Sequence, residues 1–170
     1  SRSPADNLAD LKAQVTANRS GVKALSKIVG QSSAELVVFH MTGLYERSSV
    51  LLARALEGFG ETSAEDKMDD GSLIRVKISK NEKLVVDFSG SADVHSGNLN
   101  ATPAIVRSAV LYALRLWVKT DIPLNEGLLD QVEIVTEAGI LDPPLTRDPK
   151  RCPAVAVSYT HLTLPTNRCV

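Results

Sequence analysis

The chain has 170 residues, 44% of them hydrophobic and 23% charged, which is the ordinary balance of a globular protein with one core. Its formal net charge of −1 provides no positive field to attract phosphates, so nucleic acid is not expected as a partner. Arg107 and Arg115 interrupt the apolar segment 106–118, and no apolar run approaches the roughly 20 residues of a membrane-spanning helix. We expect a soluble, cytoplasmic protein with no membrane partner.

The two cysteines, Cys152 and Cys169, have neither the spacing of a zinc site nor the number needed for a disulfide scaffold. Free thiols in a reducing cytoplasm are therefore expected. The chain begins SRSPADNLADLK, without an initiator Met and without the basic and then apolar order of a secretory signal. This start indicates an internal fragment of a longer protein.

The first third of the chain has the pattern of two long amphipathic helices. Between positions 8 and 29, apolar residues recur three, four and seven places apart, which predicts a helix that begins after Asp6 or Asn7. Ser32 followed by Glu35 is a capping-box pattern and predicts the start of a second helix. The glycines of the sequence EGFGE end that helix.

An antiparallel strand pair is predicted next. Apolar Ile74, Val76 and Ile78 alternate with other residues, which is the period of a strand with one buried face. Residues 83–88 alternate in the same way, and the polar link 80–82 is short enough for a hairpin loop.

A third helix is predicted after a polar loop. Thr102 can cap this helix, and Pro103 suits its first turn, where a missing N–H does no harm. The wide apolar face over residues 105–117 predicts that the helix is deeply packed. Residues 131–135 form a further predicted strand, and the prolines from Pro143 onward argue against regular structure after it.

The fold class that follows is α+β: two long amphipathic helices, an antiparallel hairpin, a buried helix and a further strand, as part of a larger multi-element fold. The junction 58–70 is too short to be an interdomain linker, so residues 1–157 are expected to form one unit. Residues 158–170 have no periodicity and look like a translated cloning adapter, which predicts a non-native or disordered tail.

Three polar stretches could carry chemistry: 67–72, 87–100 and 121–127. In the first, KMDDGS, the acids Asp69 and Asp70 precede a glycine and favour an ordinary turn. One carboxylate pair supplies too few oxygen ligands for calcium or magnesium, so no metal site is predicted in this chain.

The loop 87–100 lies between a strand end and a helix start and is rich in small residues. Such a loop can bind a ligand through its backbone N–H groups, or it can be a glycine-rich structural turn, and both readings stay open. It matches neither GxxxxGK[ST] nor GxGxxG, so ATP binding by this chain is not expected. His95 has the chemistry of a general base, but no nucleophile motif accompanies it and a solvated loop histidine is favoured.

In the third stretch, DIPLNEG, Asn125 and Glu126 could orient a substrate amide. Pro123 and Gly127 frame them as a turn, and hydrogen bonds to the turn backbone explain them equally well. The residues alone do not decide between these roles.

Four segments, taken together, resemble the later part of hydantoinase B / 5-oxoprolinase proteins. They are NLADLKAQ, VVDFSGS, GNLNATPAIVRSAVLYALR and DIPLNEGLLDQVEIVTEAGILDPP, in matching order over about residues 7–157. The resemblance implies a hydrolase that opens a small cyclic amide, 5-oxoproline or hydantoin, with ATP. It also implies a hydantoinase A-type subunit or domain that binds the ATP and activates the substrate carbonyl by phosphorylation. A divalent metal would lie in an upstream segment that this chain does not contain.

The resemblance assigns no catalytic residue to this chain, but the matched positions and the loop chemistry give candidates for substrate binding. These candidates are Asp87, Ser89, Gly90, His95, Gly97, Asn98, Asn100, Asn125 and Glu126, with Gly127 beside them. For most of them a structural role is the favoured alternative.

Two other functions fit the same residues. A subunit related to the acetone carboxylase alpha subunit would share the fold and differ in substrate. A non-catalytic module could use the long amphipathic helices for subunit assembly. On its own the fragment is expected to be inactive and to expose apolar surface.

Overall fold

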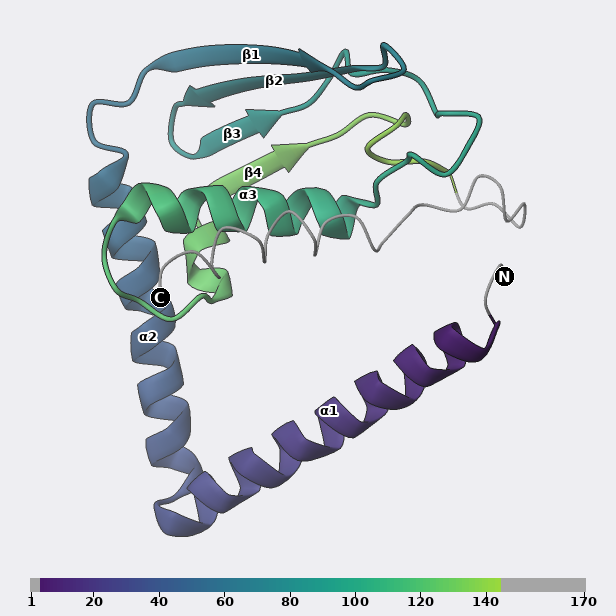
Figure 1. Ribbon diagram of the computed structural model, residues 1–170. Coiled ribbons are helices and arrows are strands. Elements are labelled where there is room, and N and C mark those ends of the chain that lie inside the picture. Colours follow the sequence, from purple (N-terminus) through teal and green to yellow (C-terminus); the bar gives the residue numbers. More distant parts are fainter. Residues whose placement is uncertain (1–3, 145–170) are drawn as a thin grey trace, which may run out of the picture. The chain divides into compact units, whose positions relative to one another are not determined.

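The computed structural model describes residues 4–144, which fall into two compact units that divide at Glu46 and Arg47. The elements are α1 (Pro4–Gln31), α2 (Ala34–Ala55), β1 (Glu61–Lys67), β2 (Leu73–Lys80), β3 (Leu84–Asp87), α3 (Pro103–Val118), the 3₁₀ helix η1 (Glu126–Leu129) and β4 (Val132–Val135) (Figure 1). The expected α+β class is confirmed. The expected boundary near Val157 and the tail 158–170 lie outside the described residues, so both stay predictions.

The first unit contains α1 and the beginning of α2. The predicted start of the first helix is wrong by a few residues, because α1 already includes Pro4, whose missing N–H is harmless in a first turn. The predicted cap of the second helix is also displaced. Ser32 closes α1, with its N–H donating to the Ile28 carbonyl at 3.2 Å, and Ser33 instead accepts from the Leu36 N–H at 3.2 Å. The capping side chain is therefore one residue later than the sequence pattern indicated.

The second unit is built on a four-stranded sheet in the order β1-β2-β3-β4. The predicted hairpin is confirmed, since β2 and β3 pair antiparallel from Lys77 opposite Asp87 to Lys80 opposite Leu84. The predicted strand at 131–135 is confirmed as β4, which pairs parallel with β3. Two parallel neighbours need a crossover between them, and α3 supplies it.

The strand β1 lies in the junction 58–70, for which the sequence predicted no strand. It pairs with β2 along its full length, from Glu61 opposite Ser79 to Lys67 opposite Leu73. All seven of its residues are exposed, so no buried face produces the alternation by which a strand is recognised. Backbone bonds to β2 and the cross-strand ion pair between Arg75 and Glu65, at 2.7 Å, hold it instead.

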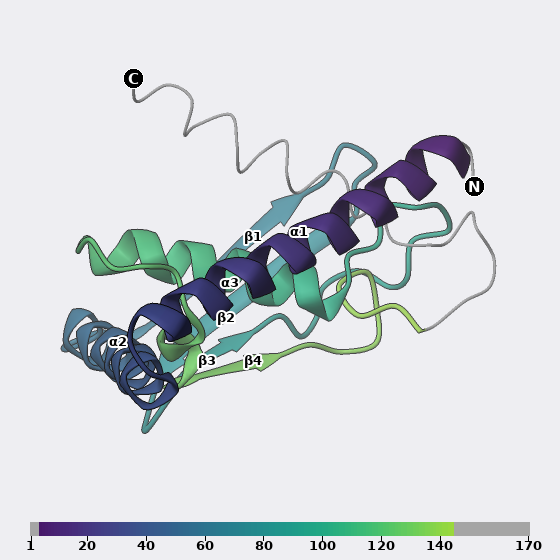
Figure 2. The same ribbon diagram turned by 90° about the horizontal axis from the view of Figure 1, so that it is seen from below.

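The helix α3 runs across one face of the sheet (Figures 1 and 2). Its predicted cap is confirmed, because the Ile105 N–H donates to Thr102 Oγ1 and Pro103 occupies the first turn. The core of the unit consists of Leu52, Leu56, Leu84, Val86, Val110, Leu114, Val118, Ile122, Leu128 and Leu129. Thus the apolar face predicted for α3 packs on β3 and the end of α2 through Val110 and Leu114, whereas Ala109, Ala113 and Trp117 of the same face are exposed.

A partly open apolar cavity of about 280 Å³ remains between α3 and the sheet. Its walls include Phe59, Ile78, Val86 and Trp117. Phe59 and Trp117 meet edge to face with ring centroids 5.2 Å apart, yet Trp117 is still 43% exposed. The packing of α3 on the sheet is therefore incomplete on this side of the described unit.

We predict that Leu114→Ala destabilises the second unit by about 2–5 kcal/mol, because it removes a side chain that is only 5% exposed. The value should fall at the lower end of that range, since Leu114 already borders the cavity. Urea unfolding of the full chain measures it. Leu116→Ala on the same helix is the matched control, because Leu116 is 59% exposed. Equal destabilisation by both variants would contradict this core.

Candidate functional site

The loop that follows β3 is held from both sides by backbone hydrogen bonds. On one side the Ala92 N–H donates to the Leu73 carbonyl of β2 at 2.8 Å. On the other side the Ile140 N–H donates to the Ala92 carbonyl at 3.0 Å, and the Ala101 N–H donates to the Ile140 carbonyl at 2.7 Å. Because β3 and β4 are parallel, the loops after both strands begin at the same edge of the sheet. Most of the candidate site residues lie in this fixed loop.

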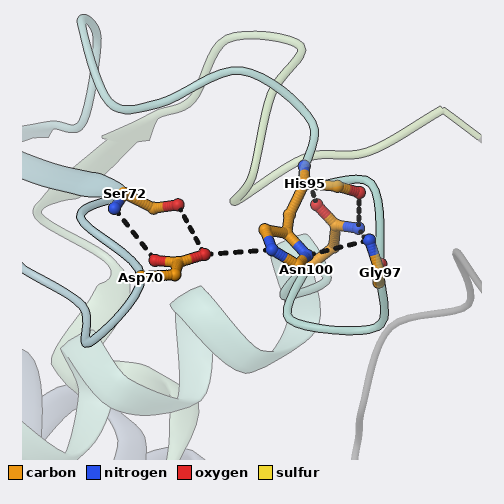
Figure 3. A network of polar contacts seen from close by, with 5 residues as sticks. All are labelled: Asp70, Ser72, His95, Gly97 and Asn100. Carbon is orange, nitrogen blue, oxygen red and sulfur yellow. Dashed lines mark hydrogen bonds and ion pairs between the residues drawn. The ribbon is translucent and has the colours of Figure 1, made fainter.

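The side chain of Asn100 organises the loop from inside (Figure 3). It is buried, and its Oδ1 accepts from the His95 N–H at 2.8 Å. Its Nδ2 donates to the carbonyls of His95 and Gly97 at 3.0 and 3.1 Å. One carboxamide thus satisfies three backbone groups that would otherwise lack partners in a tight turn.

Both ring nitrogens of His95 are engaged. Nδ1 accepts from the Gly97 N–H at 2.9 Å, and Nε2 lies 3.0 Å from Asp70 Oδ2 (Figure 3). Because Nδ1 accepts a backbone N–H, these partners assign the proton to Nε2, which donates to the carboxylate. This arrangement supports a positioning role for His95, since neither nitrogen is left to take a proton from a substrate.

Asp70 lies in the predicted turn, between β1 and β2. Its carboxylate accepts from the Ser72 N–H at 2.9 Å and from the Ser72 hydroxyl at 3.0 Å. These bonds lower the pKa of Asp70, the backbone bond most strongly, and the nearby His95 adds a smaller effect in the same direction. The turn predicted from KMDDGS is confirmed, and it has a second role that the sequence did not indicate: it fixes the ring of His95.

At the start of the loop, Asp87 Oδ1 accepts from the Ser89 N–H at 2.8 Å. Hydrogen bonds from Ser89 lower the pKa of Asp87, and the bond from the Ser89 side chain has a larger effect than the bond from its backbone. Gly90 has a φ of 79°, a backbone conformation that strains other residues, so glycine is favoured there. Its N–H donates to Glu137 Oε2 at 3.2 Å.

Asn125 and Glu126 lie in a different part of the unit and bond to the helices. Asn125 Oδ1 accepts from the Gly127 N–H at 2.9 Å and caps η1, which is the bond to the turn backbone that the sequence left open as one alternative. Its Nδ2 donates to Ser48 Oγ at 2.8 Å, and Ser48 is buried on α2. Glu126 pairs with Arg107 of α3. The structure therefore does not bring these two candidates into the loop network.

Asn98 is exposed, and it lies between Gly97, whose carbonyl accepts from the Asn100 carboxamide, and Asn100 itself. Sequence reasoning also missed Ser91, whose hydroxyl accepts from the Arg75 N–H at 3.1 Å and donates to the Phe88 carbonyl at 2.8 Å. A serine among several in a polar loop gives no signal of its own. Substrate binding by any of these residues stays a prediction.

Residues 4–144 contain no group of three or more His, Cys, Asp or Glu side chains that could hold a metal ion. Over the same residues, none of the helices has the length and apolar character needed to cross a membrane. Cys152 and Cys169 lie outside the described part of the chain. The expected cytoplasmic location and the metal in an upstream segment stay predictions.

Comparison with known proteins decides the family. The family model for hydantoinase B/oxoprolinase matches residues 1–164. The chain belongs to the hydantoinase B/oxoprolinase family. The resemblance predicted from the four sequence segments is confirmed.

Several relatives of this hydantoinase B/oxoprolinase chain are named 5-oxoprolinase. The chain is 39% identical to 5-oxoprolinase of Saccharomyces cerevisiae over 153 residues, which is 85% of this chain and 12% of that protein. It is 35% identical to 5-oxoprolinase of Dictyostelium discoideum, over 84% of this chain and 12% of that protein. It is 32% identical to 5-oxoprolinase 1 of Arabidopsis thaliana, over 79% of this chain and 12% of that protein. The chain therefore spans about an eighth of the length of these relatives.

We predict that Asn100→Ala destabilises the second unit by about 1–3 kcal/mol, because the partly buried backbone groups of His95 and Gly97 lose their hydrogen-bond partner. The unfolding free energy in urea and the hydrogen exchange of the His95 and Gly97 amides measure this effect. Asn98→Ala in the same loop is the control and should change stability by less than about 0.5 kcal/mol, because Asn98 is exposed. Unchanged amide protection in Asn100→Ala would refute the role assigned to this carboxamide.

The lowered pKa of Asp70 predicts a pH dependence of stability. The ionised carboxylate stabilises the folded chain above the ordinary value of 3.8, and this contribution disappears as the pH falls through the lower folded-state pKa. Asp70→Asn should therefore lose less stability than the unchanged chain on acidification to about pH 2. Urea unfolding across this range measures it, with the exposed neighbour Asp69→Asn as the charge-matched control. Identical acid profiles for the unchanged chain and Asp70→Asn would contradict the assignment.

Proposed function

We propose that the intact protein containing this chain opens the ring amide of 5-oxoproline in an ATP-dependent hydrolysis, with hydantoin as an alternative substrate ring. The observation that carries the proposal is the 39% identity to a protein named 5-oxoprolinase over 85% of this chain. Relatives with the same name at 35% and 32% identity support it. A hydantoinase A-type subunit or domain is part of the proposal.

The need for ATP follows from the chemistry of the substrate. A ring amide carbonyl is a poor electrophile, and activating it by phosphorylation would give water a far better site of attack. The 170 residues contain neither of the two common glycine-rich phosphate-binding patterns, GxxxxGK[ST] and GxGxxG. We therefore assign ATP binding to the A-type partner and substrate positioning to the part of the protein that includes this chain.

Asn98 is the residue of this chain that we assign to substrate contact. A ring amide offers one N–H donor and one carbonyl acceptor, and a carboxamide can complement both. Asn98 is exposed, so a ligand can reach it. The bonds that hold His95, Gly97 and Asn100 together limit the motion of the loop around it, and a fixed contact loses little entropy when the substrate binds.

We predict that Asn98→Ala in the intact protein lowers kcat/KM for ring opening by roughly two- to tenfold, the range expected for one lost hydrogen bond. Steady-state formation of the ring-opened product measures this effect. Asn81→Ala, which changes an exposed asparagine in the turn between β2 and β3, should leave kcat/KM unchanged. If both variants behave like the unchanged protein, Asn98 does not contact the substrate.

The reaction class is tested with the intact protein and its A-type partner. Each of three reactions is followed with and without ATP: 5-oxoproline to glutamate, hydantoin to an N-carbamoyl amino acid, and acetone with bicarbonate. ATP-dependent ring opening of 5-oxoproline or hydantoin supports the proposal. ATP-dependent consumption of acetone and bicarbonate, without ring opening of either cyclic amide, would overturn the proposal in favour of a carboxylase. Ring opening at the same rate with and without ATP would contradict the proposed role of the A-type partner.

A further inference from the structure

The ring of His95 accepts a hydrogen bond from its own loop only while it is neutral. Nδ1 lies 2.9 Å from the Gly97 nitrogen and accepts the N–H of that residue. Both nitrogens of a charged imidazole are donors, so a proton bound at Nδ1 would occupy the lone pair that makes this bond. The charged ring would then direct one N–H group at another, and the bond to Gly97 would be lost.

The ring and Gly97 are in close contact, so the loss of this bond requires a movement. A Cβ placed on Gly97 would lie 3.0 Å from His95 Cε1 and 3.2 Å from Nδ1. An added hydrogen on Nδ1 would point into this narrow space. Either the ring or the Gly97 peptide must therefore move when Nδ1 is protonated.

The ring is held in place by a different segment of the chain. Nε2 lies 3.0 Å from Asp70 Oδ2, in the turn between β1 and β2 (Figure 3). Protonation strengthens this contact, because a bond from a neutral ring to a carboxylate becomes an ion pair between two full charges. The charged ring therefore stays beside Asp70, and the Gly97 peptide is the group that moves.

The ring is also the group of this network that responds to pH near neutrality. Within residues 4–144, Asp70 is the one charged side chain that forms an ion pair with His95; β2, β4, α3 and the rest of the loop contribute none. Hydrogen bonds from the Ser72 backbone and hydroxyl lower the pKa of Asp70, so its carboxylate is charged where histidine titrates, between about pH 5 and 8. The His95 side chain is 23% exposed, so protons from solvent can reach it.

We propose that His95 is a pH switch for the loop 95–100: the neutral ring holds the turn at Gly97, and the protonated ring frees it. All residues of the switch belong to the second unit. The Asn100 carboxamide keeps its bonds to the His95 N–H and to the carbonyls of His95 and Gly97, so the change is local. Asn98 follows Gly97 directly, and its position therefore depends on the state of the ring.

Hydrogen exchange of the Gly97 amide in the full chain, followed by NMR at about pH 7.5 and about pH 5, tests the switch. The protection factor corrects for the intrinsic effect of pH on exchange. We expect it to fall by roughly two- to tenfold at the lower pH, which is the effect of one lost hydrogen bond. The paired amides of β2 and β3 should keep their protection, because their ladder does not include this bond.

Two substitutions separate the two contacts of the ring. His95→Asn retains an acceptor where Nδ1 lies and does not titrate in this range, so the protection of Gly97 should be equal at both pH values. His95→Gln retains a donor toward Asp70 but has no acceptor beside Gly97, so protection should be low at both. The control, His40→Asn with His161→Asn, removes the other two histidines of the chain and should retain the pH response.

Three outcomes would overturn the switch. The first is equal protection of Gly97 at both pH values in the unchanged chain. The second is a pH response that His95→Asn retains, because another group would then be responsible. The third is a neutral ring that carries its proton on Nδ1, as seen in the imidazole nitrogen chemical shifts, since Nδ1 could not then accept from Gly97.

In the intact protein the switch should make ring opening sensitive to acid, a consequence that rests on the proposed function and on the contact assigned to Asn98. The ratio of kcat/KM for His95→Asn to kcat/KM for the unchanged protein should be roughly two- to tenfold higher at about pH 5 than at about pH 7.5. Groups that titrate equally in both proteins cancel in this ratio. A constant ratio, with the Gly97 response present, would contradict the Asn98 contact. An absent Gly97 response, with ATP-dependent ring opening present, would contradict the switch and leave the proposed function standing.

Discussion

The parallel pairing of β3 with β4 is the constraint on which the second unit depends. Leu84 lies opposite Val132, and Asp87 lies opposite Val135, so the chain must cross the sheet between them. That crossing is α3, whose residues Val110 and Leu114 join Leu84 in the core. The same pairing starts the loops after β3 and β4 at one edge, where Ile140 can bond to Ala92. The packing of the core and the fixed position of the loop therefore have one topological origin.

The sequence predicted the elements that have a periodic apolar pattern and missed the strand that has none. The hairpin, α3 with its Thr102 cap, and β4 were predictable, because each has an apolar face or a capping pattern. The strand β1 was missed because its residues are exposed, and its strand conformation comes from the neighbouring β2. A pattern within seven exposed residues cannot reveal a partner strand that lies elsewhere in the chain.

The sequence predicted where the candidate site lies along the chain, but not which of its side chains contact one another. The sequence located the loop 87–100, because glycines and small polar residues gather there between a strand and a helix. It did not link His95 to Asp70, since that contact depends on how β1, β2 and the loop are folded together. It also left open whether Asn125 orients a substrate or caps a turn, and the bond to the buried Ser48 shows that this side chain has a scaffold role. The local sequence thus indicated which side chains can form hydrogen bonds, but it did not indicate which residues distant in the sequence they bond to.

The exposed strand β1 has a consequence for how the sheet meets other proteins. Edge strands attract further strands because their backbone groups are unpaired, and apolar edges promote aggregation. An incoming strand at β1 would have to desolvate Glu61, Glu65, Asp66 and Lys67, whose charges are exposed. The sheet therefore ends in a charged border that protects the more apolar β2 and β3 behind it. In this way a segment that adds almost nothing to the core disfavours edge-to-edge pairing of the described sheet with other strands.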